Sequence, residues 1–203
     1  MEIFKGVYAY VWGSAFSDCS NAYIIKGDST IIIDPGSYKS YTNLFGLMRN
    51  DGIEEVDYVF ATHLHKDHIE SAPMFLRKGA LISYSEKERR SHHFNIKPDF
   101  EMPKIVDFGI RIEVLETPGH TEGSLTFYIP EYSAAITGDL FFENGVPGRW
   151  DLVGGSRENL IRSLEKVMEL ELEFVLPGHG RIFSGRKGIE ALIEKAIHIA
   201  SKY

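Results

Sequence analysis

The sequence has little cysteine, no excess of positive charge and no long apolar run. Cys19 is the only cysteine among 203 residues, which excludes an intramolecular disulfide, a zinc ribbon and a dithiol redox site. Lysine and arginine number 22 against 29 aspartate and glutamate, giving a net charge of −7. This balance gives no general attraction to nucleic acid or anionic membranes. No apolar run approaches the roughly 20 residues of a membrane span. Because neither nucleic acid nor a membrane is favoured, we expect a small-molecule partner.

Composition and length are those of an ordinary globular chain. Hydrophobic residues make up 43% and charged residues 25% of the sequence, without low-complexity segments or repeats. A length of 203 residues predicts one domain over 1–203, with no separate C-terminal substrate domain. Residues 1–16 lack the charged start, apolar stretch and cleavage site of a signal peptide. We therefore expect a cytoplasmic protein, and leave its oligomeric state open.

Short β-branched runs alternate with helical patterns along the chain, which predicts an α/β fold. The early part favours paired strands, and Asp34-Pro35-Gly36 ends one of them in a sharp turn. The predicted strands are Thr30 to Ile33, Val56 to Ala61, Ala80 to Tyr84, Ile110 to Leu115, Leu125 to Ile129, Ala134 to Thr137 and Phe174 to Leu176. The predicted helices are Tyr38 to Met48, a helix capped by Ser156 with an apolar face of Leu160, Leu164, Val167 and Met168, and Ile189 to Ala200.

Four of these strands lead into short loops that carry histidine or aspartate. Loops at strand ends can converge on one point while the core holds them rigid. The first loop places four potential metal ligands within six residues. Histidine and aspartate are costly to bury unpaired, so this density favours a divalent cation over a solvated polar loop. The candidate ligands are His63, His65, Asp67 and His68 in the first loop, then His120, Asp139 and His179 in the other three.

The sequence HisLeuHisLysAspHis, followed by ThrProGlyHisThr, ThrGlyAsp and ProGlyHisGly, resembles the metallo-β-lactamase superfamily over almost the whole chain. The resemblance implies a four-layer αβ/βα sandwich with metals in a cleft at the strand ends. Carried over by position, His63, His65 and His120 would hold one metal, Asp67, His68 and His179 a second, and Asp139 would bridge both. Imidazole and carboxylate ligands suit zinc, and iron or manganese are also compatible.

The implied chemistry is hydrolysis by a metal-bridging hydroxide. Two cations about 3.5 to 4 Å apart share a water and lower its pKa toward about 7. One metal would polarise the substrate oxygen and stabilise the charge that develops on it. Asp67 could accept a hydrogen bond from the nucleophile, although its role as a ligand limits its freedom as a general base.

Within the superfamily, ThrProGlyHisThrGluGlySer and GlyAspLeuPhePhe before GlyArgTrpAsp most resemble the glyoxalase II-like branch of thioesterases. Two departures from that branch predict a smaller or different thioester. Glyoxalase II has a C-terminal helical extension that helps bind glutathione, whereas about one helix follows His179 here. The first motif also continues as IleGluSer where that branch usually has glycines.

Other reactions are compatible with the same ligands. Related sulfur dioxygenases use one iron, whose ligands would map onto His63, His120 and Asp139, and lactone hydrolysis also stays open. A β-lactamase role is disfavoured because Asp139 stands where the common zinc site needs cysteine. Nuclease activity would want a basic track that the acidic composition does not supply. A non-enzymatic metal-binding module would need a filled coordination sphere, whereas seven ligands shared by two metals leave room for water.

A few further residues invite a functional interpretation. The Arg149 guanidinium could bind a substrate carboxylate, or it could pair with Asp151 or a loop carbonyl. His92 and His93 lie in a polar stretch, where they are either solvated or line the cleft. His198 is interpreted as a packing or surface residue, and Cys19 has no evident partner base for a nucleophilic role.

Overall fold

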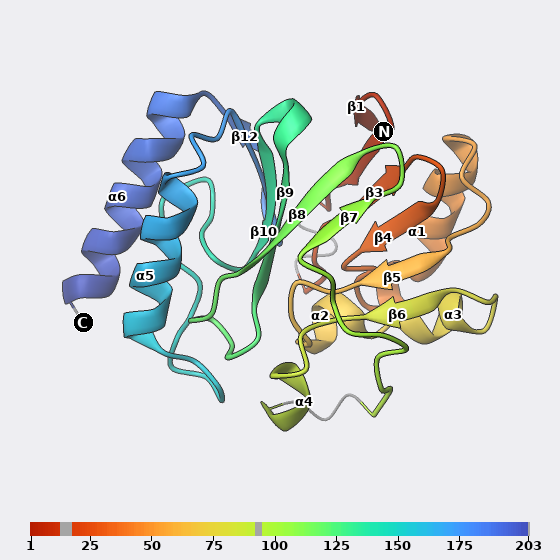
Figure 1. The fold of residues 1–203 in the computed structure, drawn as a ribbon, viewed down its shortest axis with the longest axis horizontal. Helices are drawn as coiled ribbons and strands as arrows, with labels where there is room; N and C mark the ends of the chain where they lie inside the picture. The colour runs from red at the N-terminus through yellow and green to blue at the C-terminus, as the bar shows by residue number, and fades with distance from the viewer. Residues whose placement is uncertain (13–17, 92–94, 203) are drawn as a thin grey trace.

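The computed structural model describes residues 1–12, 18–91 and 95–202. They form two six-stranded sheets. Both sheets mix parallel and antiparallel pairs, and helices cover their outer faces (Figure 1). The predicted α/β class and the four-layer αβ/βα sandwich are confirmed.

The first sheet has the order β1-β2-β3-β4-β5-β6. Its first four strands are antiparallel, and β4, β5 and β6 run parallel. In β3 and β4, Tyr23 and Ile33 face the space between the sheets, whereas Ile24 and Ile32 face the helices. This alternation buries both faces of the sheet, as expected when helices pack on one side of it. The strands are β1 (Glu2–Phe4), β2 (Val7–Tyr10), β3 (Ala22–Lys26), β4 (Thr30–Ile33), β5 (Tyr58–Phe60) and β6 (Leu81–Ser83).

The second sheet has the order β12-β11-β10-β9-β8-β7. Only β10 and β11 are parallel, so the ends of these two strands lie at the same edge. Its strands are β7 (Ile105–Asp107), β8 (Arg111–Glu116), β9 (Leu125–Ile129), β10 (Ala134–Gly138), β11 (Phe174–Pro177) and β12 (Phe183–Ser184). The predicted strands that overlap β4, β5, β6, β8, β9, β10 and β11 are thus confirmed to within two residues at each end.

The helices form the outer layers. Leu44 and Met48 of α1 pack with Phe75 of α3 against the first sheet. Leu160 and Ile193 belong to α5 and α6, which cover the second sheet on the opposite side of the molecule (Figure 1). The helices are α1 (Tyr38–Asn50), α2 (Lys66–Ile69), α3 (Ala72–Leu76), α4 (Glu88–Ser91), α5 (Arg157–Met168) and α6 (Arg186–Lys202), with a 3-10 turn at Pro130–Tyr132.

The predicted cap of α5 is confirmed. The Ser156 hydroxyl accepts a hydrogen bond from the Asn159 backbone N–H at 3.3 Å, which satisfies one of the donors left open at a helix start. Leu160, Leu164 and Val167 are buried, as predicted, and Met168 packs at the edge of the same cluster. No helix in the described part of the chain is long and apolar enough to cross a membrane.

Candidate metal centre

All seven predicted ligands lie close together, where loops from the two sheets meet. His63 and His65 follow β5, while Asp67 and His68 lie on α2. His120, Asp139 and His179 come from the second sheet, after β8, β10 and β11 respectively. The ligand atoms form two main groups of mutually close atoms, the first of His63, His65 and His120 and the second of Asp67, His68 and His179. His63, His68 and Asp139 are also mutually close and connect the two groups.

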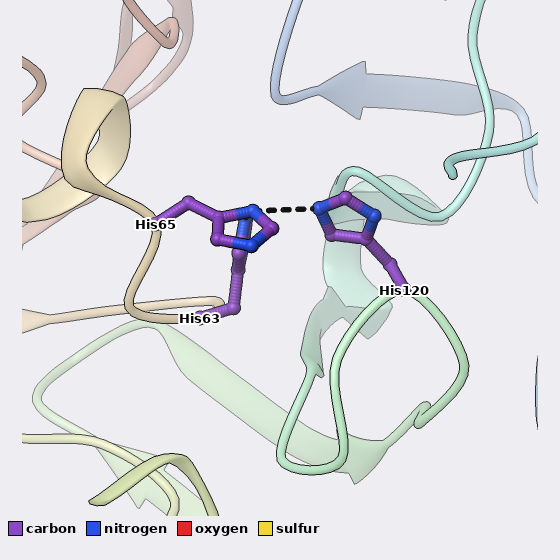
Figure 2. Close-up of side chains that lie close together, drawn as sticks. All are labelled: His63, His65 and His120. Carbon is purple, nitrogen blue, oxygen red and sulfur yellow. Dashed lines mark hydrogen bonds between the residues drawn. The ribbon is translucent and has the colours of Figure 1, made fainter. Parts of the chain in front are cut away.

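The first group brings three imidazole nitrogens together. His65 Nδ1 lies 3.0 Å from His63 Nε2 and 2.9 Å from His120 Nε2. Figure 2 shows the three rings pointing toward one another from two separate loops. His63 and His120 are almost fully buried, and His65 is partly exposed. This is the geometry of three ligands around a single point.

The second group lies around His179. The His179 Nε2 atom is 3.0 Å from Asp67 Oδ2 and 3.3 Å from His68 Nε2. His68 is fully buried, whereas the side chains of Asp67 and His179 are 33% and 27% exposed. The second group is therefore open to solvent on the side of Asp67 and His179.

The Asp139 carboxylate lies between the two groups. One oxygen, Oδ2, is 3.6 Å from His120 Nε2 and 3.7 Å from His179 Nε2. The other, Oδ1, is 3.4 Å from His68 Nε2. A carboxylate in this position can offer an oxygen ligand to a metal in either group.

Hydrogen bonds outside the cluster fix the tautomers of three of the histidines. The His120 Nδ1–H donates to the Arg149 carbonyl oxygen at 2.7 Å, and the His68 Nδ1–H donates to Asp34 Oδ2 at 2.8 Å. A carbonyl and a carboxylate only accept, so in the neutral rings the proton is on Nδ1 and Nε2 is left as a lone pair.

The same holds for His63. The Thr62 hydroxyl donates to Asp34 Oδ2 at 2.6 Å, so its oxygen accepts the Nδ1–H of His63 at 3.0 Å. Support of each ligating imidazole by a second acceptor is the usual arrangement behind a metal site.

These features fit a bound divalent metal. His65 Nδ1 lies 3.0 Å from His63 Nε2 and 2.9 Å from His120 Nε2. When these two Nε2 atoms carry lone pairs, a proton on His65 Nδ1 is the only one that can lie between the three nitrogens. In addition, the Asp139 Oδ1 atom is buried, and its contact with His68 Nε2, at 3.4 Å, is longer than a strong hydrogen bond. A cation would satisfy all of these acceptors together.

Electrostatics within the cluster favour ionised carboxylates. Burial raises the pKa of Asp139, but the charge and hydrogen bond of His68, with the charges of His179 and His120, outweigh burial and hold this pKa far below its usual value. Burial likewise raises the pKa of Asp67, and the hydrogen bond from His179 with the charge of His68 overcomes it. Both side chains are therefore anionic at neutral pH, as metal ligands must be.

The two buried histidines are shifted in opposite directions. Burial lowers the pKa of His68, but the charges of Asp139 and Asp34 and their hydrogen bonds raise it well above 6.5. Burial lowers the pKa of His120, and the charge of Asp139 only partly opposes it. In the metal-free protein His68 therefore holds a proton at neutral pH, while His120 is neutral.

This difference predicts proton release when metal binds. At pH 7, uptake of a divalent metal should displace the proton that His68 holds, whereas Asp67, Asp139 and His120 have none to release. The metal affinity should rise with pH until pH exceeds the raised pKa of His68. Conversely, protonated His68 stabilises the metal-free fold fully below pH 6.5, and this contribution is lost as pH rises through the folded-state pKa.

Calorimetric zinc titrations in two buffers with different ionisation enthalpies measure the protons released. The variant His198→Asn, altered at an exposed histidine on α6, should release the same number as wild type. Metal uptake without proton release at pH 7 would contradict the assignment.

Asp34 is a site residue that sequence reasoning interpreted only as part of a turn. It is buried and adopts a left-handed φ of 53°. Its carboxylate accepts the Thr62 backbone N–H at 2.7 Å, as well as the bonds from the Thr62 hydroxyl and His68. Asp34 therefore orients both the loop of His63 and the ring of His68. The signal in the sequence was an acidic residue directly after a buried strand.

Glycine is required where the second sheet meets the cluster. A Cβ at Gly178 would lie 2.2 Å from Asp139 Oδ1 and 2.8 Å from the His68 ring. The Pro-Gly-His-Gly motif thus lets the backbone pass directly behind the carboxylate, and any side chain at Gly178 would displace it.

The remaining predicted residues lie outside the cluster. Arg149 pairs with Asp151 through two bonds of 2.9 and 2.8 Å, and its side chain is 67% exposed. Pairing with Asp151 is one of the alternatives considered above, and Arg149 contacts the cluster through its carbonyl oxygen. A substrate contact by its guanidinium stays a prediction. His92 and His93 lie outside the described residues.

Cys19 and His198 have no contact with the cluster among the described residues. Cys19 is buried, with its sulfur 2.8 Å from the Ser40 hydroxyl. His198 is exposed on α6, which fits the surface role considered for it.

The chain is similar to known proteins in sequence and in fold. Residues 19–179 match the model of the metallo-beta-lactamase superfamily. The chain belongs to this superfamily. The matched stretch contains all seven clustered residues, with His179 as its last position. Family and cluster together identify a metallo-hydrolase of the metallo-beta-lactamase superfamily and point to divalent metal ions.

Three of its relatives illustrate the range of similarity. A probable metallo-hydrolase of Methanocaldococcus jannaschii is 30% identical over 185 residues, covering 80% of this chain and 88% of that protein. A hydroxyacylglutathione hydrolase of Brucella anthropi is 30% identical over 145 residues, covering 71% of this chain and 52% of that enzyme. The crystal structure of TTHA1623 in a di-iron-bound form is 27% identical, with a TM-score of 0.75, and the match covers 91% of this chain and 96% of that one.

Proposed function

We propose that this metallo-beta-lactamase family protein hydrolyses a small acyl thioester with two divalent metal ions. His63, His65 and His120 would hold the first metal, and Asp67, His68 and His179 the second, with Asp139 shared between them. The observation that carries this proposal is the position of Asp139, whose Oδ2 atom lies 3.6 Å from His120 Nε2 and 3.7 Å from His179 Nε2. One carboxylate thus faces both groups of ligands.

When bound, the metals would supply a water of lowered pKa and polarise the substrate carbonyl. The protein's own contribution is the charge and shape of the site. Asp67 and Asp139 stay anionic and offset the cationic charge, while His63, His68 and His120 are held in the tautomer that presents Nε2. The partly exposed side chains of Asp67 and His179 leave this side open for a substrate. Rigid support of each ligand limits the reorganisation needed during the reaction.

The thioester class rests on the resemblance to glyoxalase II and on the Brucella anthropi hydroxyacylglutathione hydrolase. The aligned region spans only about half of that enzyme, at 52% of its length. The superfamily match over residues 19–179 includes the cluster, so the hydrolytic chemistry is what the similarity supports. We propose a thioester with a smaller thiol part than glutathione, and a small molecule in place of nucleic acid as the partner.

Two metals are supported by the ligand set and by a relative. The seven ligands divide into two groups around Asp139, and TTHA1623 has been crystallised in a di-iron-bound form. Neutral imidazoles and carboxylates bind zinc, and they also bind iron and manganese. We propose zinc as the native metal, with iron or manganese as the alternatives.

Elemental analysis of protein purified without added metal or chelator, together with a thioester hydrolysis assay, tests this function. We expect about two zinc ions per chain, turnover that a chelator removes, and recovery when zinc is restored. Lactones and phosphodiesters serve as comparison substrates. One iron per chain, oxygen consumption with a persulfide and no thioester turnover would instead establish the sulfur dioxygenase alternative built on His63, His120 and Asp139.

A further inference from the structure

A buried glutamate connects the two loops that carry the first group of ligands. Glu88, on α4, is fully buried. Its Oε2 atom accepts the backbone N–H of Leu64 at 2.8 Å, and its Oε1 atom accepts the backbone N–H of Gly123 at 2.8 Å. One carboxylate therefore joins the loop after β5 to the loop between β8 and β9.

Both contacts lie directly beside predicted metal ligands. Leu64 stands between His63 and His65, and Gly123 is three residues after His120. A further backbone bond runs from the Leu125 N–H, at the start of β9, to the Thr62 carbonyl at 2.8 Å, next to the strands. Glu88 thus fixes the distance between the two loops at Leu64 and Gly123, next to the ligands.

The contact with Gly123 is closely packed. A Cβ at Gly123 would lie 2.8 Å from both Cγ and Oε1 of Glu88. Such distances are too short for ordinary packing, so a side chain there would displace the carboxylate. Glycine at position 123 therefore leaves the space that the buried Glu88 carboxylate occupies.

The second group of ligands has separate anchors. His68 is held by Asp34, and its carbonyl accepts the Gly36 backbone N–H at 2.8 Å. The Asp67 carbonyl accepts the Ser20 backbone N–H at 3.1 Å. The His179 loop is held by Asn21, whose side-chain amide donates to the carbonyls of Pro177 and Gly180 at 3.0 and 2.9 Å. These anchors involve Asp34, Ser20, Gly36 and Asn21.

We propose that Glu88 is a positioning residue for the first metal site, acting through the backbone of Leu64 and Gly123. It sets the distance of His120 from His63 and His65, and hence the affinity of that site for metal, without affecting the second site. This inference rests on the proposed function, which assigns His63, His65 and His120 to one metal.

The variant Glu88→Gln tests the proposal. Glutamine keeps the length of the side chain but replaces one acceptor oxygen by an NH2 group, which then faces a backbone N–H as a second donor. Zinc is titrated into metal-free protein against a competing chelator. We expect two classes of site in wild type, and in the variant one class weakened about 10- to 100-fold, the range for loss of an outer-shell partner, with the other unchanged.

Two further variants separate positioning from stability. Gly123→Ala acts on the same contact from the opposite loop and should weaken the same site, so the test does not depend on the folding of Glu88→Gln. Asp57→Asn makes the same chemical change at an exposed carboxylate that accepts the Thr30 backbone N–H at 2.7 Å. It should bind zinc like wild type. Leu44→Ala removes a fully buried side chain of α1 and should lower the melting temperature while both sites keep their affinity.

The outcomes distinguish this inference from the proposed function. Two classes in wild type with selective loss in Glu88→Gln and Gly123→Ala support it. Two classes in wild type that are unchanged or equally weakened in these variants overturn the role of Glu88 and leave the two-metal centre intact. Wild-type protein that binds no zinc, or only one ion, overturns the two-metal centre and the role of Glu88 with it.

Discussion

Replacing Asp139 with alanine is expected to remove thioester hydrolysis and most of the bound metal. Among the residues that the structure describes, Asp139 is the one whose carboxylate faces both groups of ligands, with contacts of 3.4 to 3.7 Å to His68, His120 and His179. Its loss would take a ligand from each of the two proposed metals and leave them near fewer negative charges. We expect turnover to fall at least about 100-fold, beyond the loss typical of an outer-shell partner.

This prediction is tested by measuring the metal content of purified Asp139→Ala together with its rate of thioester hydrolysis. Asp139→Asn keeps the shape of the side chain and one acceptor oxygen but not the charge, and it should retain more metal than the alanine variant. Asp99→Ala is a control, because Asp99 is exposed and accepts the Ile82 backbone N–H at 2.8 Å, away from the cluster. Full turnover and normal metal content in Asp139→Ala would show that the binuclear assignment is wrong.

The sequence predicted the layers of the fold because the core strands are strongly patterned. The strand Thr30–Ile33 is an apolar β-branched run that ends at Asp34-Pro35-Gly36, and its predicted bounds are those observed. The helix Arg157–Met168 begins after its predicted cap, Ser156. In both cases a local chemical signal marks the boundary, so no knowledge of distant contacts is needed.

Short elements had no such signal. The helices α2 and α4 have 4 residues each, too few to display a helical period. Strand β7, Ile105–Asp107, buries only its middle residue at the edge of the sheet, and β12 has 2 residues. These elements depend on tertiary contacts, which the local pattern does not encode.

The same distinction applies to the site. Candidate ligands were visible because histidine and aspartate are dense in short loops after apolar strands. The residues that orient those ligands were not, since their roles depend on contacts far along the chain. Asp34 is 34 residues from His68, and Glu88 is 24 and 35 residues from Leu64 and Gly123. An acidic residue in a turn or a short helix normally indicates exposure, and only the fold shows that these two are buried.

The variant Asp34→Ala should show how strongly the fold depends on this hidden support. Alanine would leave three buried donors without their acceptor, namely the Thr62 backbone N–H, the Thr62 hydroxyl and His68 Nδ1–H. It would also place a residue that disfavours left-handed backbone at a φ of 53°. Removing one partner of a buried ionic network costs about 3 to 5 kcal/mol. For a chain of this size, that loss lowers the melting temperature by roughly 6 to 20 °C.

Thermal unfolding of metal-free and zinc-loaded Asp34→Ala separates the two roles of Asp34. The metal-free melting temperature reports the lost hydrogen bonds. The increase in melting temperature on adding zinc reports zinc binding at the second metal site. In the variant, His68 loses the acceptor that holds its Nδ1–H. We therefore expect zinc to bind about 10- to 100-fold more weakly there. Asp34→Asn retains a side-chain oxygen and tolerates the left-handed backbone, so its losses should be smaller. If Asp34→Ala unfolds at the wild-type temperature and binds both zinc ions normally, Asp34 does not orient the ligands, and the tautomer of His68 must be set by the metal itself.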